Sequence, residues 1–378
     1  MTSGAERTGN RLLAVPARDP RWILPARGSH LGHAMTMYQP SRVLPRFASR
    51  GLALGSRFLG GAPARTLGTA CPMALQHQIE HVMERAGIDL GILDAEPVAW
   101  TGSPGPDRKT TVALLASRRP VAYAKVATTP TARASLQAEH QALRAVAGTP
   151  VADHAPDALL LSESDEFTVL FLSPVAGKKC SSRTRPDSRF EAFLGALGAL
   201  KGASASCWVE SIRRRADLLP SGNQKTLIAQ ALDRAVDDDV LRSVRCVLSH
   251  GDFTPWNCFV GSVLQVVDWE YASFRPPMWD LFHWFVQSEV HGRSTSSRRV
   301  VQNVLAWEHR AKLPTSLLGS AIPVRQGTSR GMLLYLADSL TFALEGNTAP
   351  CPRGDSLRTR LIEHYLTGTS HSRGDDES

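Results

Sequence analysis

The spacing of apolar positions along the chain predicts where strands end and helices begin. Residues 110–117 and 120–127 are apolar and rich in β-prone side chains. Arg118 and Arg119 lie at the junction between them, so the two segments are expected to form a hairpin. A further strand of the same kind is expected at 167–172, where the chain then meets proline and glycine and turns.

Elsewhere the apolar residues return every three or four positions, which is typical of amphipathic helices. This spacing predicts helices at 72–86 and 131–147. This helical spacing dominates beyond residue 177. Helices are expected there at 187–201, 205–218, 224–238, 277–291, 297–312, 328–346 and 355–368.

The most informative polar residues interrupt this pattern between two short apolar runs, 246–249 and 263–267, which are expected to be buried strands. Pro255 and a glycine-bearing turn force a loop between them. The loop would present Asp252 and Asn257 on one side. The segment therefore predicts a polar site at the ends of two strands.

Each residue type in this segment suits phosphoryl transfer, which needs positioned charges and little covalent chemistry from the protein. Asp252 would orient the substrate hydroxyl and finally accept its proton. Asn257 and Asp268 supply the oxygen atoms that Mg²⁺ prefers. His250 would brace the loop by hydrogen bonds, and Glu270 would either reach a second metal or cap the strand end.

Three separated elements carry a family resemblance: the sequence from His250 to Asn257, the triplet starting at Asp268, and the segment from Pro276 to Leu281. Together they resemble the aminoglycoside phosphotransferase and choline kinase family. The resemblance implies an α+β, bilobal protein-kinase-like fold with a small antiparallel-sheet N-lobe and a mainly helical C-lobe. It also implies that Asp252 is the catalytic base, that Asn257 and Asp268 bind the metal, and that Asp280 supports the catalytic loop.

The upstream sequence has residues that resemble the nucleotide-binding parts of such a lobe. Lys125 lies on the second strand of the hairpin, and Glu139 lies near the apolar face of the following helix, so they resemble the kinase pair in which a Glu orients a phosphate-binding Lys. By the same resemblance, backbone groups near Phe171 and Ser173 would bind the purine. The loop at 102–106 stands where a phosphate-covering loop belongs, but its prolines lack N–H donors, so an ordinary turn is an equal alternative.

The expected organisation is a basic N-terminal extension at 1–70, a nucleotide-binding N-lobe at 71–176, a C-lobe at 177–368 and a disordered tail at 369–378. The six cysteines form no regular pattern and are typical of a reducing compartment. The sequence has no apolar run long enough for a membrane helix and no signal-peptide core at its start. A cytoplasmic protein is expected.

The positive charge is concentrated at the N-terminus. Residues 1–70 hold ten Arg against Glu6 and Asp19, a local net charge of +8, which equals the formal charge of the whole chain. At 41–61 the arginines recur at helical intervals beside apolar residues. A solvated helix packed on the kinase, peripheral contact with an anionic membrane and an organellar transit peptide all stay open. Aromatic residues are too sparse there for nucleic-acid binding.

Two competing functions follow. The first is a small-molecule kinase that moves the γ-phosphoryl group of ATP, with Mg²⁺, to a hydroxyl of an amino sugar, amino alcohol or related metabolite. The second is a catalytically idle, nucleotide-binding relative that acts through its basic extension. A zinc hydrolase, suggested by His77 and His81 one helical turn apart, lacks a recognisable third ligand, and a surface helix is expected instead.

Overall fold

The computed structural model describes residues 12–15, 20–25, 69–102, 104–117, 119–236, 244–292, 295–310, 324–346 and 351–367. The predicted tail at 369–378 and the arginine-bearing stretch at 41–61 lie outside the described residues, as do Ser103 and Arg118. The chain divides into two compact units, one formed by residues 1–147 and 156–175 and the other by residues 148–155 and 176–378.

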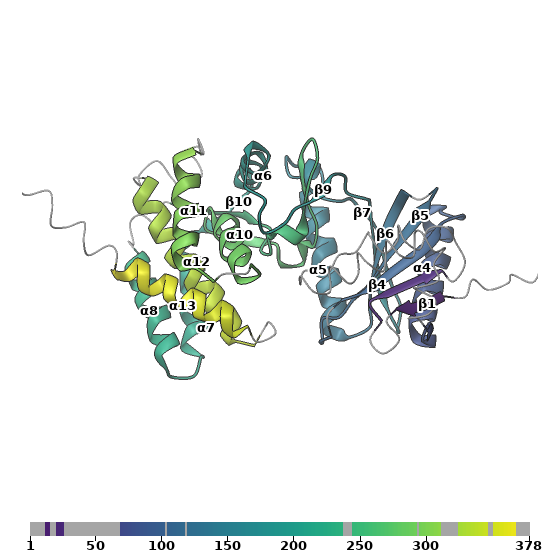
Figure 1. Cartoon of the computed structure of the whole chain (residues 1–378), viewed down its shortest axis with the longest axis horizontal. Helices are drawn as coiled ribbons and strands as arrows, with labels where there is room; N and C mark the ends of the chain where they lie inside the picture. Colours follow the sequence, from purple (N-terminus) through teal and green to yellow (C-terminus); the bar gives the residue numbers. More distant parts are fainter. Residues whose placement is uncertain are drawn as a thin grey trace, which may run out of the picture. The chain divides into compact units, whose positions relative to one another are not determined.

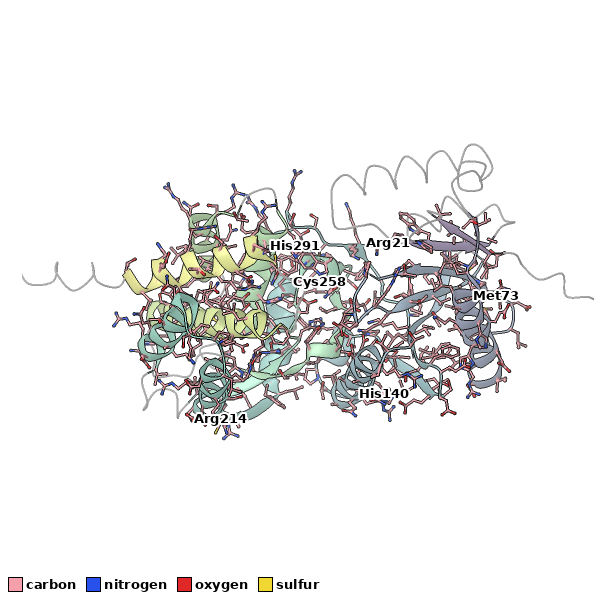
Figure 2. All side chains as sticks on the ribbon, turned by 90° about the horizontal axis from the view of Figure 1, so that it is seen from below. Arg21, Met73, His140, Arg214, Cys258 and His291 are labelled. Atoms are coloured by element: carbon pink, nitrogen blue, oxygen red, sulfur yellow. The ribbon has the colours of Figure 1, made fainter. Side chains whose placement is uncertain are left out.

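The first unit is built on an antiparallel sheet (Figure 1), whose strand order is β3-β1-β2-β4-β5-β6-β8-β7. Its strands are β1 (Leu12–Val15), β2 (Trp22–Pro25), β3 (Thr69–Ala70), β4 (Glu96–Thr101), β5 (Thr110–Ala116), β6 (Arg119–Ala127), β7 (Ala158–Glu163) and β8 (Thr168–Leu172). β5 and β6 pair from Thr110↔Val126 to Ala116↔Arg119, so the predicted hairpin is confirmed.

Two helices accompany the sheet, α4 (Met73–Leu90) and α5 (Pro130–Val146). α4 buries Ile79, Val82 and Ala86 in the apolar cluster that includes Ala124 and Val126 of β6. α5 begins where Thr129 accepts the N–H of Ala132, with proline at its first position, as helix starts commonly do. Both predicted helices are confirmed.

Strands β1 and β2 show that the sheet begins earlier in the chain than residue 71. They pair with each other, and β2 continues the sheet through Trp22↔Trp100 and Ile23↔Ala99 of β4. The side chain of Ile23 is wholly buried in the same core as α4. Residues 1–70 are expected from the sequence to form an extension, whereas parts of that segment belong to this unit.

The second unit is mainly helical, as the sequence predicts. Its helices are α6 (Ser188–Ala199), α7 (Ala205–Asp217), α8 (Asn223–Ala235), α10 (Trp279–Val290), α11 (Ser297–Arg310), α12 (Val324–Leu344) and α13 (Pro352–Thr367). α12 contacts α8, α13 and α7, so it forms the centre of this helical group (Figure 1). The predicted α+β class is confirmed, because the large sheet lies in the first unit and most of the helices lie in the second.

Short strands carry the polar loop in this unit. They are β9 (Lys178–Lys179), β10 (Lys201–Ser204), β11 (Arg245–Ser249), β12 (Cys258–Val260), β13 (Leu264–Val266) and β14 (Ser273–Arg275). β11 pairs with β14, and β12 pairs with β13. The loop from residue 250 to 257 therefore starts at one small sheet and ends at another, and both of its ends are fixed.

Candidate active site

The loop after β11 is held by a buried carboxylate from α10. Asp280 lies in the first turn of that helix and is 3% exposed. Its two oxygens accept the backbone N–H groups of His250, at 2.7 Å, and Gly251, at 3.0 Å. Such charge-assisted bonds to backbone donors are strong. Asp280 thus has the contacts expected of a residue that supports the catalytic loop.

Gly251 is required at this bend by its backbone and by its surroundings. Its φ is +84°, and a Cβ placed on it would lie 2.2 Å from the carbonyl oxygen of Tyr271 and 2.4 Å from Nη1 of Arg275. Only glycine adopts this conformation in such a space at little cost. The loop consequently passes directly against the segment that follows Asp268.

His250 braces the loop from within. Its Nδ1 accepts the backbone N–H of Asp252 at 3.2 Å, so the ring hydrogen lies on Nε2, which donates to the carbonyl of Val267 at 3.0 Å. Burial lowers the pKa of His250, and the nearby carboxylates of Asp280, Asp252 and Asp268 only partly oppose this shift. A neutral imidazole in this position joins β11 to the end of β13 and does not need to exchange protons.

Asp252 has a donor on each of its carboxylate oxygens. Nδ2 of Asn257 donates to Oδ2 at 2.8 Å, and Nε2 of His283 lies 3.2 Å from Oδ1. The Asp252 side chain is 33% exposed, so the carboxylate is both fixed and accessible. Each of its oxygens keeps a lone pair for a further proton. A general base for a hydroxyl substrate requires this combination.

The two predicted metal ligands flank the hairpin of β12 and β13, with Asn257 directly before β12 and Asp268 after β13. Asn257 ends the short 3₁₀ turn η2 (Pro255–Asn257), and its backbone carbonyl accepts the N–H of Val267 at 2.9 Å. Asp268 is the next residue along and has a left-handed backbone, with φ of +68°. This bend ends the strand and starts the 3₁₀ turn η3 (Trp269–Tyr271), which contains Glu270.

The residues present fit a magnesium ion. Because the amide nitrogen of Asn257 donates to Asp252, its amide oxygen remains as an acceptor for a cation. Among the described residues, no group of three or more His, Cys, Asp and Glu side chains gathers as a metal site. The amide oxygen of Asn257 and the carboxylate of Asp268 suit Mg²⁺, which is commonly held by one or two protein side chains together with nucleotide phosphates.

In the first unit the structure pairs Lys125 with Glu139. The ammonium group lies 2.6 Å and 2.7 Å from the two carboxylate oxygens of Glu139, which is wholly buried, while Lys125 is 9% exposed. Ala124 and Val126 enter the core under α4, so strand alternation directs Lys125 to the opposite face of the sheet. A buried lysine held in one orientation suits contact with a phosphate group.

The residues predicted near the purine lie on β8 and directly after it. β8 lies between β6 and β7, and Phe171 pairs with Ala124 on one side and Leu160 on the other. The N–H of Ser173 donates to the carbonyl of Asp157 at 3.0 Å. The backbone of Phe171 is therefore inside the sheet, and the purine contact from this segment stays a prediction. The 102–106 loop joins β4 to β5, where the N–H of Gly102 donates to the carbonyl of Lys109 at 2.9 Å.

Several aromatic and acidic residues near the motif are structural. Trp269 and Trp284 are essentially wholly buried, which makes them core residues. Asp280 bonds to the loop, and Glu289 is buried beside Arg299, with 3.4 Å between their charged groups. On α4, His77 and His81 pack against the ring of Phe167, at 5.4 Å and 5.1 Å between ring centroids.

Sequence reasoning missed two contacts at this site, that of His283 with Asp252 and that of Tyr335 with His283. His283 follows Asp280 by three positions on α10, which places both on one face of the helix. That spacing was a usable signal. Tyr335 comes from α12, far along the chain, and no sequence pattern links it to the loop.

The class defined by these observations is that of the kinase-like phosphotransferases, in which positioned oxygens and charges perform most of the catalysis. The family model described as the phosphotransferase enzyme family matches residues 107–313, which is more than half of the chain. The chain belongs to this family. It is a phosphotransferase with an alcohol group as acceptor.

Comparison with solved structures gives more distant likenesses. Spectinomycin phosphotransferase, solved with ADP and spectinomycin, is 12% identical, with 77% of this chain and 98% of that chain covered and a TM-score of 0.43. A putative fructosamine-3-kinase from Haemophilus somnus 129PT is 14% identical, with 75% and 96% covered and a TM-score of 0.44. These values are too low to carry an argument about substrate. No curated protein sequence matches the chain.

Proposed function

We propose that this protein is a small-molecule kinase that transfers the γ-phosphoryl group of ATP to a hydroxyl of an amino sugar, amino alcohol or related metabolite. The observation that carries the proposal is the carboxylate of Asp252, which is held at both oxygens and yet is one-third exposed. A fixed, accessible carboxylate beside a metal-binding amide is the arrangement that phosphoryl transfer to an alcohol needs.

Each residue has one role in this proposal. Asp252 orients the acceptor hydroxyl and takes its proton as the new oxygen–phosphorus bond forms and the bond from the γ-phosphorus to the β,γ-bridging oxygen breaks, with ADP as the leaving group. Asn257 and Asp268 would hold Mg²⁺, which when bound neutralises charge on the phosphate oxygens. Lys125, oriented by Glu139, binds phosphate oxygens of the nucleotide, and Glu270 is a candidate for a second metal.

The competing function, an idle nucleotide-binding protein that acts through its basic N-terminus, has less support. Asp252, Asn257 and Asp280 keep the contacts that a working loop requires. The arginine-bearing stretch at 41–61, on which the alternative and any membrane contact depend, lies outside the described residues. Among the described residues, no helix is long and apolar enough to span a membrane.

The test is the substitution Asp252→Ala, assayed with Mg²⁺, labelled ATP and a pool of amino sugars and amino alcohols, with phosphorylated products read by mass spectrometry. Loss of the base should lower the turnover number by about 10²–10⁴-fold. The matched control is Asp233→Ala on α8, which removes a carboxylate that is 75% exposed and should leave turnover unchanged. Equal turnover by the Asp252→Ala variant and the wild type would refute the assignment.

A further inference from the structure

A chain of contacts leads from Asp252 into the helical body of the second unit. Oδ1 of Asp252 lies 3.2 Å from Nε2 of His283, and Nδ1 of His283 lies 3.3 Å from the hydroxyl of Tyr335. His283 is 8% exposed and Tyr335 is wholly buried. The chain therefore runs from a partly exposed carboxylate to a hydroxyl in the core.

The direction of the hydrogen bonds in this chain follows from the groups themselves. An ionised carboxylate only accepts, so Nε2 of His283 must carry the hydrogen and donate to Asp252. Burial raises the pKa of Tyr335 to about 12, which keeps its hydroxyl protonated. Tyr335 can consequently donate to Nδ1 of His283, and this bond fixes the tautomer that serves Asp252.

The ring of His283 is also fixed by stacking. It lies parallel to the indole of Trp279, with 4.9 Å between centroids and 14° between planes. Nε1 of Trp279 in turn donates to Asp338 of α12 at 3.1 Å, and the guanidinium of Arg275 lies over the indole at 4.3 Å. His283 thus has one available orientation, and in that orientation Nε2 faces Asp252.

The second donor to Asp252 differs in origin from the first. Asn257 belongs to the same loop as Asp252 and is also the proposed metal ligand, so its contact moves with the loop. His283 belongs to α10 and is tied to α12 through Tyr335. Among the described residues, the bond from His283 is the one that connects the carboxylate of Asp252 directly to the helices.

We propose that His283 is a positioning residue for Asp252, and that Tyr335 sets the tautomer and orientation of His283. The inference rests on the proposed function, because it assumes that Asp252 is the base. His283 holds Oδ1 so that the carboxylate keeps one rotamer while the acceptor hydroxyl approaches. Displacement of a catalytic group by about 1 Å costs on the order of 100-fold in rate, which is the size of effect that such an anchor controls.

Three substitutions separate this role from simple packing. His283→Phe keeps a ring to stack on Trp279 but removes the donor. His283→Gln removes the ring but places an amide N–H close to the former position of Nε2. Tyr335→Phe keeps the core packing and removes only the hydroxyl that orients His283.

The experiment measures total transfer of the γ-phosphoryl group from labelled Mg·ATP to the same pool of amino sugars and amino alcohols and to water, with the full chain. His283→Phe should lower the turnover number by about 10- to 100-fold, with the KM for ATP unchanged within about twofold. His283→Gln should recover to within about threefold of the wild type, and Tyr335→Phe should lose about two- to fivefold. Thermal unfolding of each variant shows whether it is folded.

The outcomes distinguish the two proposals. Wild-type turnover by Asp252→Ala, or no transfer by the wild type, would overturn the proposed function itself. If Asp252→Ala is inactive while folded His283→Phe is as active as the wild type, His283 does not position the base. Equal loss in His283→Phe and His283→Gln would also overturn the inference, because the bonding group would then be irrelevant. If His283→Phe does not fold, the other two variants test the inference. Turnover near the wild-type value for His283→Gln, together with a partial loss for Tyr335→Phe, supports it, and any other result overturns it.

Discussion

At the scale of single residues, charge burial distinguishes the two parts of the candidate site. Asp252 stays one-third exposed, whereas Glu139 is wholly buried and is balanced by one lysine at 2.6 Å. Removing one member of a buried ion pair leaves a buried charge without that partner. The resulting loss of folding stability exceeds the net stability that the pair itself contributes. Glu139 therefore serves both stability and the orientation of Lys125.

We predict that Glu139→Ala lowers the free energy of unfolding of its unit by about 3–5 kcal/mol, because it removes a carboxylate that lies 2.6 Å from the buried ammonium group of Lys125. The double change Lys125→Met with Glu139→Leu should restore much of this stability and still abolish turnover. Urea unfolding and the phosphoryl-transfer assay measure the two effects.

The control for this experiment is Asp89→Ala. It breaks a more exposed pair with Arg85, spaced one helical turn apart on α4, and should cost about 0.5 kcal/mol or less. A similar cost for Glu139→Ala and Asp89→Ala would show that the buried pair has no special role.

Sequence reasoning singled out residues that are marked by their neighbours along the chain, and it missed contacts between residues that are distant in the chain. Lys125, Glu139 and Asp280 were found because strand alternation, helical spacing and the family resemblance all apply locally. His283 and Tyr335 were missed because the bond between them joins two helices. The purine contact expected near Phe171 and Ser173 stays a prediction; β8 pairs with β7 through Phe171 and Leu160, a contact that the sequence pattern did not reveal.

At the scale of elements, the loop between β11 and η2 positions the proposed base, Asp252. It reverses direction at Gly251, and its N–H groups are held by Asp280. The predicted strands and helices around it match the structure within a few residues, because burial and periodicity are strong there. β12 and β13 form a local hairpin, but β11 pairs with β10 and β14, and β12 pairs with β9, across longer stretches of chain that the sequence pattern does not link.

We predict that Gly251→Ala lowers turnover by at least tenfold and the free energy of unfolding by about 2 kcal/mol. The new Cβ would meet the carbonyl of Tyr271, and the φ of +84° is strained for alanine. Circular dichroism melts and the transfer assay measure both quantities.

The matched control is Gly195→Ala in α6, where a Cβ meets nothing within 4 Å. Alanine favours a helix over glycine by about 1 kcal/mol, so this variant should be equally or more stable and fully active. If both variants behave alike, the backbone of Gly251 is not the constraint inferred here.

At the scale of the whole molecule, the N-terminal segment is more than a basic appendage. β1 and β2 extend the sheet, and Leu24 and Ile23 are wholly buried. The sequence showed only short apolar patches there, and such patches cannot reveal which strand they will pair with. The predicted domain boundary at residue 70 stays a prediction, but an independent unit that starts at residue 71 would lose these strands.

We predict that deletion of residues 1–30 destabilises the sheet-bearing unit by about 3–6 kcal/mol, from the burial lost at two large apolar side chains alone. Deletion of residues 1–10 keeps both strands and should leave the melting temperature unchanged. Differential scanning calorimetry of the two truncated chains makes the comparison. Equal melting temperatures would mean that β1 and β2 contribute nothing to the fold.

The most direct test of the central claim is a crystal structure of the full chain with a non-hydrolysable ATP analogue and Mn²⁺ in place of Mg²⁺, with the metal located by anomalous scattering. We predict a metal peak about 2.0–2.3 Å from the amide oxygen of Asn257 and a carboxylate oxygen of Asp268, with the nucleotide phosphates completing the coordination of the metal. A metal bound to the phosphates with neither side chain in contact would contradict it.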